Sequence, residues 1–397
     1  MDALSTHLAR VGHWLQNATF LPWSTPRTWQ VIYPYNAQLV VIWPVLFLQN
    51  DLLVGFPQWF SALVSAVAVA GIAMELGASQ RAALYAALTF LTFPLIVLQS
   101  STAQTDLIVM APFVMAVYFL LRGFRQRRMA FLVLSALALG LGIGVKQTFF
   151  FLLPSLGVIL LVSWRHYHAT NRALLMWLTC SLVATLVLGT MSYAVNWATF
   201  GHPLGPPQIV AESSGKLQAE DILPKIGYNA LRLFYQSLDT SGLPRPVDGY
   251  AHKAKMRLFQ WLFRITGWQV EGDRYTFPAH PFSLASKNQA EESHAWYGPL
   301  SALLLYPAML YALWTGLRGR RLQAAFPMAF ALFAIVEILA RPGWDPYQGR
   351  YFASVFALNA PLVAVFFEDS SRHKALQRVF RSFVVTLSAL ILFVALT

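Results

Sequence analysis

Several ionisable residues flank the apolar stretches of this sequence, and their types and spacing indicate what chemistry they could do. Asp2 lies at the N-terminus, Asp106 begins one apolar stretch, and Lys146 separates two others. Later apolar stretches are preceded or joined by a further set: Glu291, Glu292, His294, Arg341, Asp345 and Arg350. A carboxylate can act as a general base towards a hydroxyl group, and Arg or Lys can hold a phosphate. Together they suggest transfer of a group from a lipid phosphate carrier to an acceptor hydroxyl, with the cations stabilising the departing phosphate.

The composition is that of an integral membrane protein. Of the 397 residues, 57% are hydrophobic and 12% are charged, which separates the chain from soluble domains. A short apolar stretch at 36–49 is expected to form a partial or re-entrant helix. Longer stretches are predicted to span the membrane at 56–74, 82–99, 104–121, 129–145, 147–163, 173–197, 295–317, 322–340, 350–367 and 380–397. The sequence therefore predicts an all-α polytopic bundle of about 10–11 transmembrane helices.

Other classes of protein fit less well. The net charge of +12 is explained by cytoplasmic loops beside anionic lipid, so membrane lipids are expected partners and nucleic acid is not. The single cysteine, Cys180, excludes an intrachain disulfide. The sequence has no Gly-rich phosphate loop and no Cys/His cluster with metal-ligand spacing.

Basic loops orient the predicted spans. The sequence has four basic loops between predicted spans, and by the positive-inside rule all four are cytoplasmic. Counting spans from them places residues 1–55 and 198–294 outside. The same count places Asp106, Lys146 and Arg350 at the external face. Ionisable groups at membrane depth favour a functional site, although snorkelling at span ends leaves a structural role open for each of them. The basic loops lie near residues 122–128, 165–172, 318–321 and 372–381.

The expected organisation has three parts: an N-terminal membrane module (1–197), an external loop (198–294) and a C-terminal membrane module (295–397). Within the loop, residues 224–239 and 251–266 are predicted to be helical. The second helix combines cations with aromatic and aliphatic side chains. It either lies in the interface against lipid headgroups or caps the bundle.

Residues 1–17 are expected to form a short amphipathic helix. Arg10 lies close to its polar face, and a helix of this kind lies in the membrane interface rather than crossing it. The topology places this helix outside although no span precedes it, which predicts that a first transmembrane helix is missing from this sequence; a short translocated tail is the alternative. Its apolar stripe consists of Leu4, Leu8, Val11 and Leu15.

Taken in order, these motifs resemble the GT-C superfamily of integral-membrane glycosyltransferases, and within it the bacterial group related to protein mannosyltransferases and aminoarabinose transferases. Those enzymes have an acidic residue in the first external loop, an amphipathic helix and a Tyr-Pro-Pro-like element, which residues 2–10 and 33–37 match. The order and common sidedness of the short motifs carry the resemblance, which runs over nearly the whole chain. The remaining matches are at 104–106, 142–146, 291–299 and 349–352.

The resemblance implies an inverting glycosyltransferase that takes a sugar from a polyprenyl phosphate at the outer face of the bacterial inner membrane. It gives Asp2 the place of the catalytic carboxylate and makes Lys146 and Arg350 candidates for contacts to the phosphate. Asp106 would be a second acid that orients a cation or substrate. Further substrate contacts are expected at Arg10, Glu292 and His294.

The resemblance does not identify the sugar, or whether the acceptor is a glycolipid, a polysaccharide or a protein. A divalent cation between carboxylate and phosphate is compatible with the preference of such ions for oxygen ligands. The oligomeric state is also open.

Two other functions remain alternatives. A transporter or flippase for a lipid-linked substrate tends to have repeated halves and ionisable groups near the midplane, whereas this sequence shows no obvious repeat and its candidate groups cluster at one face. A non-catalytic membrane subunit that kept the fold is the other alternative. It is favoured by the missing first span and by Ala3, which follows Asp2 where many relatives have a second acid.

Overall fold

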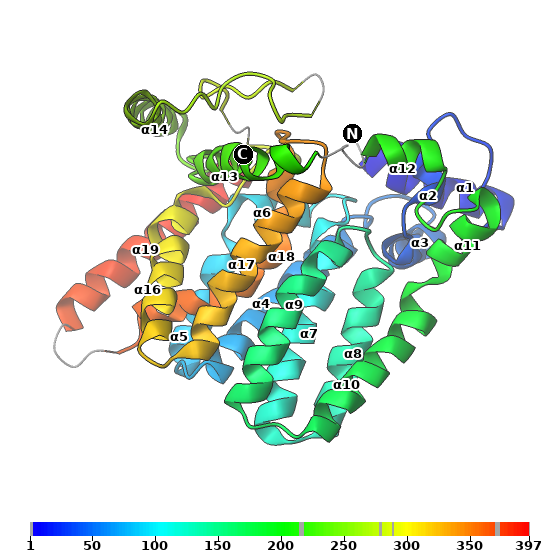
Figure 1. The fold of residues 1–397 in the computed structure, drawn as a ribbon, viewed down its shortest axis with the longest axis horizontal. Helices are drawn as coiled ribbons and strands as arrows, with labels where there is room; N and C mark the ends of the chain where they lie inside the picture. Colours follow the sequence, from blue (N-terminus) through cyan, green and yellow to red (C-terminus); the bar gives the residue numbers. More distant parts are fainter. Residues whose placement is uncertain (1–2, 214–217, 278–279, 288–289, 370–373, 397) are drawn as a thin grey trace.

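The computed structural model describes residues 3–213, 218–277, 280–287, 290–369 and 374–396. These residues form an all-α structure in which the long helices run side by side as one bundle (Figure 1). Apart from helices, the described residues form only two isolated β-bridges, between Gly272 and Phe282 and between Thr276 and Trp344. Helices are the expected solution for apolar stretches in lipid, because they satisfy their own backbone hydrogen bonds.

Eight helical segments of the described chain are long and apolar enough to cross a membrane. They are α4 (Phe56–Glu75), α7 (Asp106–Gln126), α9 (Phe149–His166), α10 (Asn171–Ala184) with η2 (Thr185–Gly189), α15 (Gly298–Leu300) with η4 (Ser301–Leu305) and α16 (Tyr306–Leu317), α17 (Arg321–Ala340), the segment Gln348–Phe367, and α19 (Lys374–Leu396).

The predicted spans all coincide with helices. One of them, predicted at 82–99, is broken into α5 (Gln80–Leu91) and α6 (Pro94–Ser100), which meet at 67° and add a ninth span if counted together. The break lies where Pro94 starts the second helix, because proline suits the first helical position but cannot continue a preceding one. Two further apolar helices, α3 (Asn36–Leu48) and α8 (Met129–Ile143), are shorter.

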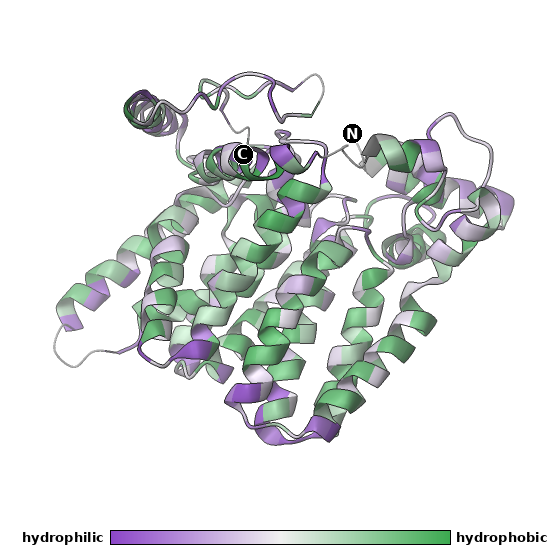
Figure 2. Cartoon of the chain, in the orientation of Figure 1, coloured by the Kyte–Doolittle hydropathy of each residue, from purple (hydrophilic) through white to green (hydrophobic). Residues whose placement is uncertain are grey.

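The bundle has two distinct ends. The α7–α8, α9–α10 and α16–α17 connections lie together at one end, which we call the basic end (Figure 1). At the opposite end, which we call the site end, α13 (Ile222–Ser237) and α14 (Arg245–Thr266) lie across the bundle. Hydrophilic residues gather at both ends, and the middle of the long helices is hydrophobic (Figure 2). This distribution is expected for a multi-pass membrane protein.

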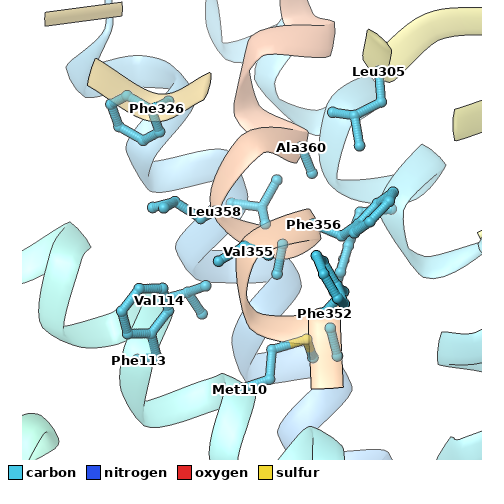
Figure 3. Packing of buried hydrophobic residues seen from close by; sticks show 14 of the residues in the cluster. Met110, Phe113, Val114, Leu305, Phe326, Phe352, Val355, Phe356, Leu358 and Ala360 are labelled. Carbon is cyan, nitrogen blue, oxygen red and sulfur yellow. The ribbon is translucent and has the colours of Figure 1, made fainter. Parts of the chain in front are cut away.

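The most deeply buried span runs through the centre of the bundle and consists of η5 (Gln348–Phe352), α18 (Ala353–Asn359) and η6 (Ala360–Phe367). Met110 and Val114 of α7 pack beside Phe352 and Val355 of this span (Figure 3). By contrast, α19 leaves most of its side chains outside the packed core.

The N-terminal segment is helical where the structure describes it, as η1 (Ala3–Leu8) followed by α1 (Ala9–Asn17). The predicted apolar stripe is only partly its buried face, however: Val11 of the stripe is buried and Leu4 is exposed, while Arg10 and Trp14, which lie outside the stripe, are buried. Packing of α1 against protein, including α3, determines which side is covered.

The remaining short helices connect these elements. Both helices predicted in the long loop are present, as α13 and α14, and α14 begins earlier than expected, at Arg245. The others are α2 (Trp29–Ile32), α11 (Met191–Phe200), α12 (Pro207–Ser213) and η3 (Ala219–Asp221).

Candidate functional site

A cavity of about 500 Å³ lies at the site end of the bundle. Its walls come from segments far apart in the sequence: the N-terminal segment, the start of α7, the α8–α9 connection, and the chain between α17 and η5. The lining residues are Thr6, His7, Trp29, Tyr33, Pro34, Gln104, Thr105, Val145, Lys146, Gln147, Thr148, Phe151, Phe277, Ala340, Arg341, Pro342, Arg350 and Tyr351.

Asp106 and Lys146, two of the predicted site residues, form an ion pair beside this cavity. Lys146 lies in the α8–α9 connection and lines the cavity, whereas Asp106 begins α7 and is 1% exposed. Gln99 of α6 donates from Nε2 to Asp106 Oδ2 at 3.2 Å. Gln58 of α4 accepts hydrogen bonds from two backbone amides in the first turn of α7. Three helices thus fix the position of the carboxylate that holds Lys146.

Arg341 is a cavity-lining cation that was not among the candidate substrate contacts from the sequence. It directly follows α17, and its Nε lies 3.4 Å from Oε1 of Glu337. Its Nη2 donates to Asp345. A signal was present in the sequence, because an acid and an Arg four residues apart face each other on a helix.

Three cations surround the ring of Tyr351. The Nζ of Lys146 lies 4.9 Å from the ring centroid, and the guanidinium carbons of Arg341 and Arg350 lie 4.4 and 5.1 Å from it. Arg350 also donates from Nη2 to the Tyr351 hydroxyl at 3.1 Å. An aromatic ring attracts cations electrostatically, so Tyr351 helps to keep three like charges close together.

The carboxylates that pair with two of these cations lie behind them. Asp106, Glu337 and Asp345 are all at most 3% exposed, and no carboxylate is among the cavity-lining residues of the described chain. A ligand in the cavity therefore meets cationic groups, while the compensating negative charge is buried in the wall. Electrostatic attraction is stronger in such a poorly solvated site than in water, and Arg can bind a phosphate through two parallel hydrogen bonds. The arrangement suits an anion.

Arg10, an expected substrate contact, is buried within the N-terminal segment and does not line the cavity. Its guanidinium donates to the backbone oxygens of Gln30 at 2.5 Å and Pro34 at 3.5 Å, and to Gln38 Oε1 at 3.3 Å. Burial lowers the pKa of Arg10 to about 10, so it remains charged at neutral pH. Arg10 therefore connects α1 by hydrogen bonds to α3 and to the chain that precedes α3.

The N-terminal segment forms one wall of the cavity. Thr6 and His7 line it, and Gln38 Nε2 lies 2.5 Å from His7 Nδ1. Asp2, the predicted catalytic residue, lies outside the described residues. No three described His, Cys, Asp or Glu side chains are grouped so that they could hold a metal ion, and a divalent cation at this site stays a prediction.

Glu292 and His294, the other expected contacts, do not line the cavity. The Glu292 backbone oxygen accepts a hydrogen bond from Gln99 Nε2 at 2.9 Å. His294 pairs with Glu291, and its ring centroid lies 4.6 Å from that of Tyr347. This segment thus contacts the groups that support the cations.

The chain just before Arg350 is packed tightly against the same segment. The Tyr297 hydroxyl donates to the Gly349 backbone oxygen at 2.8 Å. A Cβ atom at Gly349 would lie 2.7 Å from Trp296 Nε1, which explains why glycine is required at this close approach. The motif at 291–299 therefore positions Arg350 from behind, a role that its sequence did not predict.

Comparisons with known proteins agree with this architecture. Residues 34–193 match the model of the dolichyl-phosphate-mannose-protein mannosyltransferase family. No curated protein matches the sequence significantly. The structure is similar to ArnT from Cupriavidus metallidurans in the apo state, with a TM-score of 0.57 and 14% identity, covering 96% of this chain and 57% of ArnT.

Two other solved structures are similar. ArnT from the same organism bound to undecaprenyl phosphate has a TM-score of 0.54 and 13% identity, with 97% of this chain and 59% of that chain covered. The oligosaccharyltransferase of Archaeoglobus fulgidus, in a complex with zinc and sulfate, has a TM-score of 0.52 and 14% identity, with 92% and 45% covered. This chain therefore spans about half the length of these proteins.

At such low identity the likeness is one of fold. Both ArnT and the oligosaccharyltransferase are GT-C glycosyltransferases, and the family model matches the N-terminal part of the same bundle. The predicted resemblance is thus confirmed, and this chain is a multi-pass membrane protein with the fold of the GT-C glycosyltransferases.

Proposed function

We propose that this chain transfers a sugar from a polyprenyl-phosphate donor to an acceptor hydroxyl. The observation that carries the proposal is the cavity wall, in which Lys146, Arg341 and Arg350 line the space while the buried acids that pair with Lys146 and Arg341 lie behind them. Such a wall suits a phosphate. The shared fold of ArnT, which has been solved with undecaprenyl phosphate, supports a lipid phosphate as the source of that group.

We also propose that the site faces the outer side of the bacterial inner membrane. The cavity lies at the end of the bundle opposite the Arg-rich connections. Loops rich in Lys and Arg usually remain in the cytoplasm, and this preference supports an external site.

In the proposed reaction, a base takes the proton of the acceptor hydroxyl, and the acceptor oxygen forms a bond to the anomeric carbon. The bond from that carbon to the phosphate oxygen breaks, and the configuration at carbon inverts. Asp2 is the proposed base. The cations stabilise the negative charge on the departing polyprenyl phosphate.

Binding tests the donor site directly. Purified protein in nanodiscs should bind undecaprenyl phosphate and not undecaprenol, which lacks the anion. Arg350→Gln is expected to weaken binding about 10- to 100-fold, because a charge-assisted hydrogen bond contributes about 1.5–3 kcal/mol. Arg81→Gln, the same change at an exposed arginine in the first turn of α5, is the control. Equal binding of both lipids would contradict the proposal.

Activity separates the enzyme from its alternatives. Incubation with a polyprenyl-phosphate sugar should release polyprenyl phosphate in the presence of an acceptor, and Asp2→Asn should abolish the release. Equal rates in both proteins would rule out Asp2 as the base. Binding without release would favour a non-catalytic subunit, and movement of the intact lipid across a vesicle membrane would favour a flippase.

A further inference from the structure

One face of α13 carries four buried polar residues. Lys225, Asn229, Arg232 and Gln236 recur at i, i+4, i+7 and i+11, which places them on the same side of the helix, and none is more than 5% exposed. Burying such groups is costly unless they are hydrogen-bonded. All four donate to backbone carbonyls of two loops beside the cavity.

The middle pair holds the loop that precedes Phe277, a cavity-lining residue. Asn229 Nδ2 donates to the Tyr275 backbone oxygen at 3.0 Å. Arg232 Nε donates to the Val270 backbone oxygen at 2.8 Å. These two side chains fix the loop without contacting the cavity themselves.

The outer pair holds the chain that follows α17. Lys225 Nζ donates to the Arg341 backbone oxygen at 2.6 Å. Gln236 Nε2 donates to the Pro346 backbone oxygen at 3.1 Å, and its Oε1 accepts from Trp344 Nε1 at 3.0 Å. Burial lowers the pKa of Lys225. Its ammonium lies at the C-terminal end of α17, where a positive charge interacts favourably with the last carbonyls of the helix.

We infer that Lys225 is a positioning residue: it fixes the backbone of Arg341 and thereby places the Arg341 guanidinium where it binds the phosphate of the lipid donor. The inference rests on the proposed function. Glu337 and Asp345 hold the Arg341 side chain, but Lys225 holds its main chain. Without that bond the Arg341 guanidinium would shift relative to Lys146. Small displacements of a group that contacts the ligand can weaken binding strongly.

Lys255 supplies a matched control. It is a half-buried lysine, less enclosed than Lys225, and its Nζ likewise donates to backbone oxygens, at 3.2 Å to Tyr235 and 2.9 Å to Leu238. It lies on α14 and does not line the cavity. A general loss of stability after removal of a buried ammonium would therefore affect both lysines.

The experiment measures affinity for undecaprenyl phosphate in nanodiscs, together with thermal unfolding. We expect Lys225→Met to weaken binding about tenfold, which corresponds to the loss of one hydrogen bond between the displaced Arg341 guanidinium and the phosphate. Lys225→Arg should recover most of this loss, and Lys255→Met should bind within about twofold of wild type. Lys225→Gln, which keeps a donor, gives a second comparison if the Met variant does not fold.

A double variant separates positioning from a general effect. In an Arg341→Gln background, Lys225→Met should weaken binding no further, because the group that it positions is gone. If wild type binds the lipid and Lys225→Met binds equally well, or loses affinity as much as Lys255→Met does, the inference is wrong while the proposed function stands. If wild type does not bind undecaprenyl phosphate, both are wrong.

Discussion

Glu337 and Arg341 lie one helical turn apart at the site end of α17, with 3.4 Å between Glu337 Oε1 and Arg341 Nε. Glu337 is fully buried. Replacing Arg341 with Gln removes its cation, and breaking a buried pair in this way costs about 3–5 kcal/mol. The Glu337→Gln, Arg341→Gln double variant should therefore unfold at a higher temperature than Arg341→Gln alone.

Thermal unfolding of the two single variants and the double variant in one detergent measures the energetic coupling between Glu337 and Arg341. Simple addition of the two single effects would contradict it, because independent sites add whereas coupled neighbours do not.

Replacing Lys146 should destabilise the protein more than replacing Asp106, its partner in the ion pair. Lys146→Met leaves the buried Asp106 carboxylate without its cation, which is expected to cost about 3 kcal/mol. Asp106→Asn leaves Lys146 at the cavity, where it is 22% exposed and can be hydrated. Thermal unfolding should therefore show a larger loss for Lys146→Met, and a larger loss for Asp106→Asn would mean that Lys146 is not solvated.

Gly349→Ala should disturb the chain beside Arg350. The new Cβ atom would lie 2.7 Å from Trp296 Nε1 and 2.8 Å from the Ala295 backbone oxygen, so the backbone must move, at a cost of about 1–3 kcal/mol. Gly157→Ala in α9 is the control, since nothing lies within 4 Å of its Cβ position. We expect a lower melting temperature and weaker binding of undecaprenyl phosphate for Gly349→Ala only; unchanged binding would show that Arg350 tolerates the shift.

Lys255 should make stability depend on alkaline pH. Burial lowers its pKa to about 8 from 10.5, although Asp239 and Asp248 oppose the shift. Between these values the unfolded chain binds more protons than the folded one, so the contribution of Lys255 to stability increases as the pH rises. On the same helix, burial and then the charge of Lys255 lower the pKa of His252.

The measurement is the difference in melting temperature between wild type and Lys255→Met from about pH 7 to about pH 10. As the pH rises across this interval, the melting temperature of wild type should increase relative to that of Lys255→Met. A constant difference would place the pKa of Lys255 at its ordinary value.

The membrane spans were predictable because lipid imposes helices on long apolar stretches. The same argument gave no warning that residues 82–99 would bend at Pro94, since length and hydropathy do not distinguish a straight span from a broken one. Both helices of the long loop were also predicted, although α14 begins earlier than expected.

The candidate site was predictable only in part. Lys146 and Arg350 were expected near a phosphate, and both line the cavity. Arg10 is also expected to contact the substrate, yet its guanidinium donates to the backbone oxygens of residues 30 and 34. Whether an arginine faces a cavity or bonds to a distant carbonyl depends on tertiary contacts that periodicity does not report.

Arg350 and Tyr351 belong to the span that is most deeply buried in the bundle. Segments of this kind open only when much of the structure opens with them. Arg350 is therefore attached to a part of the chain that we expect to open only rarely, so that fraying of helix ends elsewhere does not release it. An anion bound to Arg350 would then leave by its own escape rather than by local opening of this span.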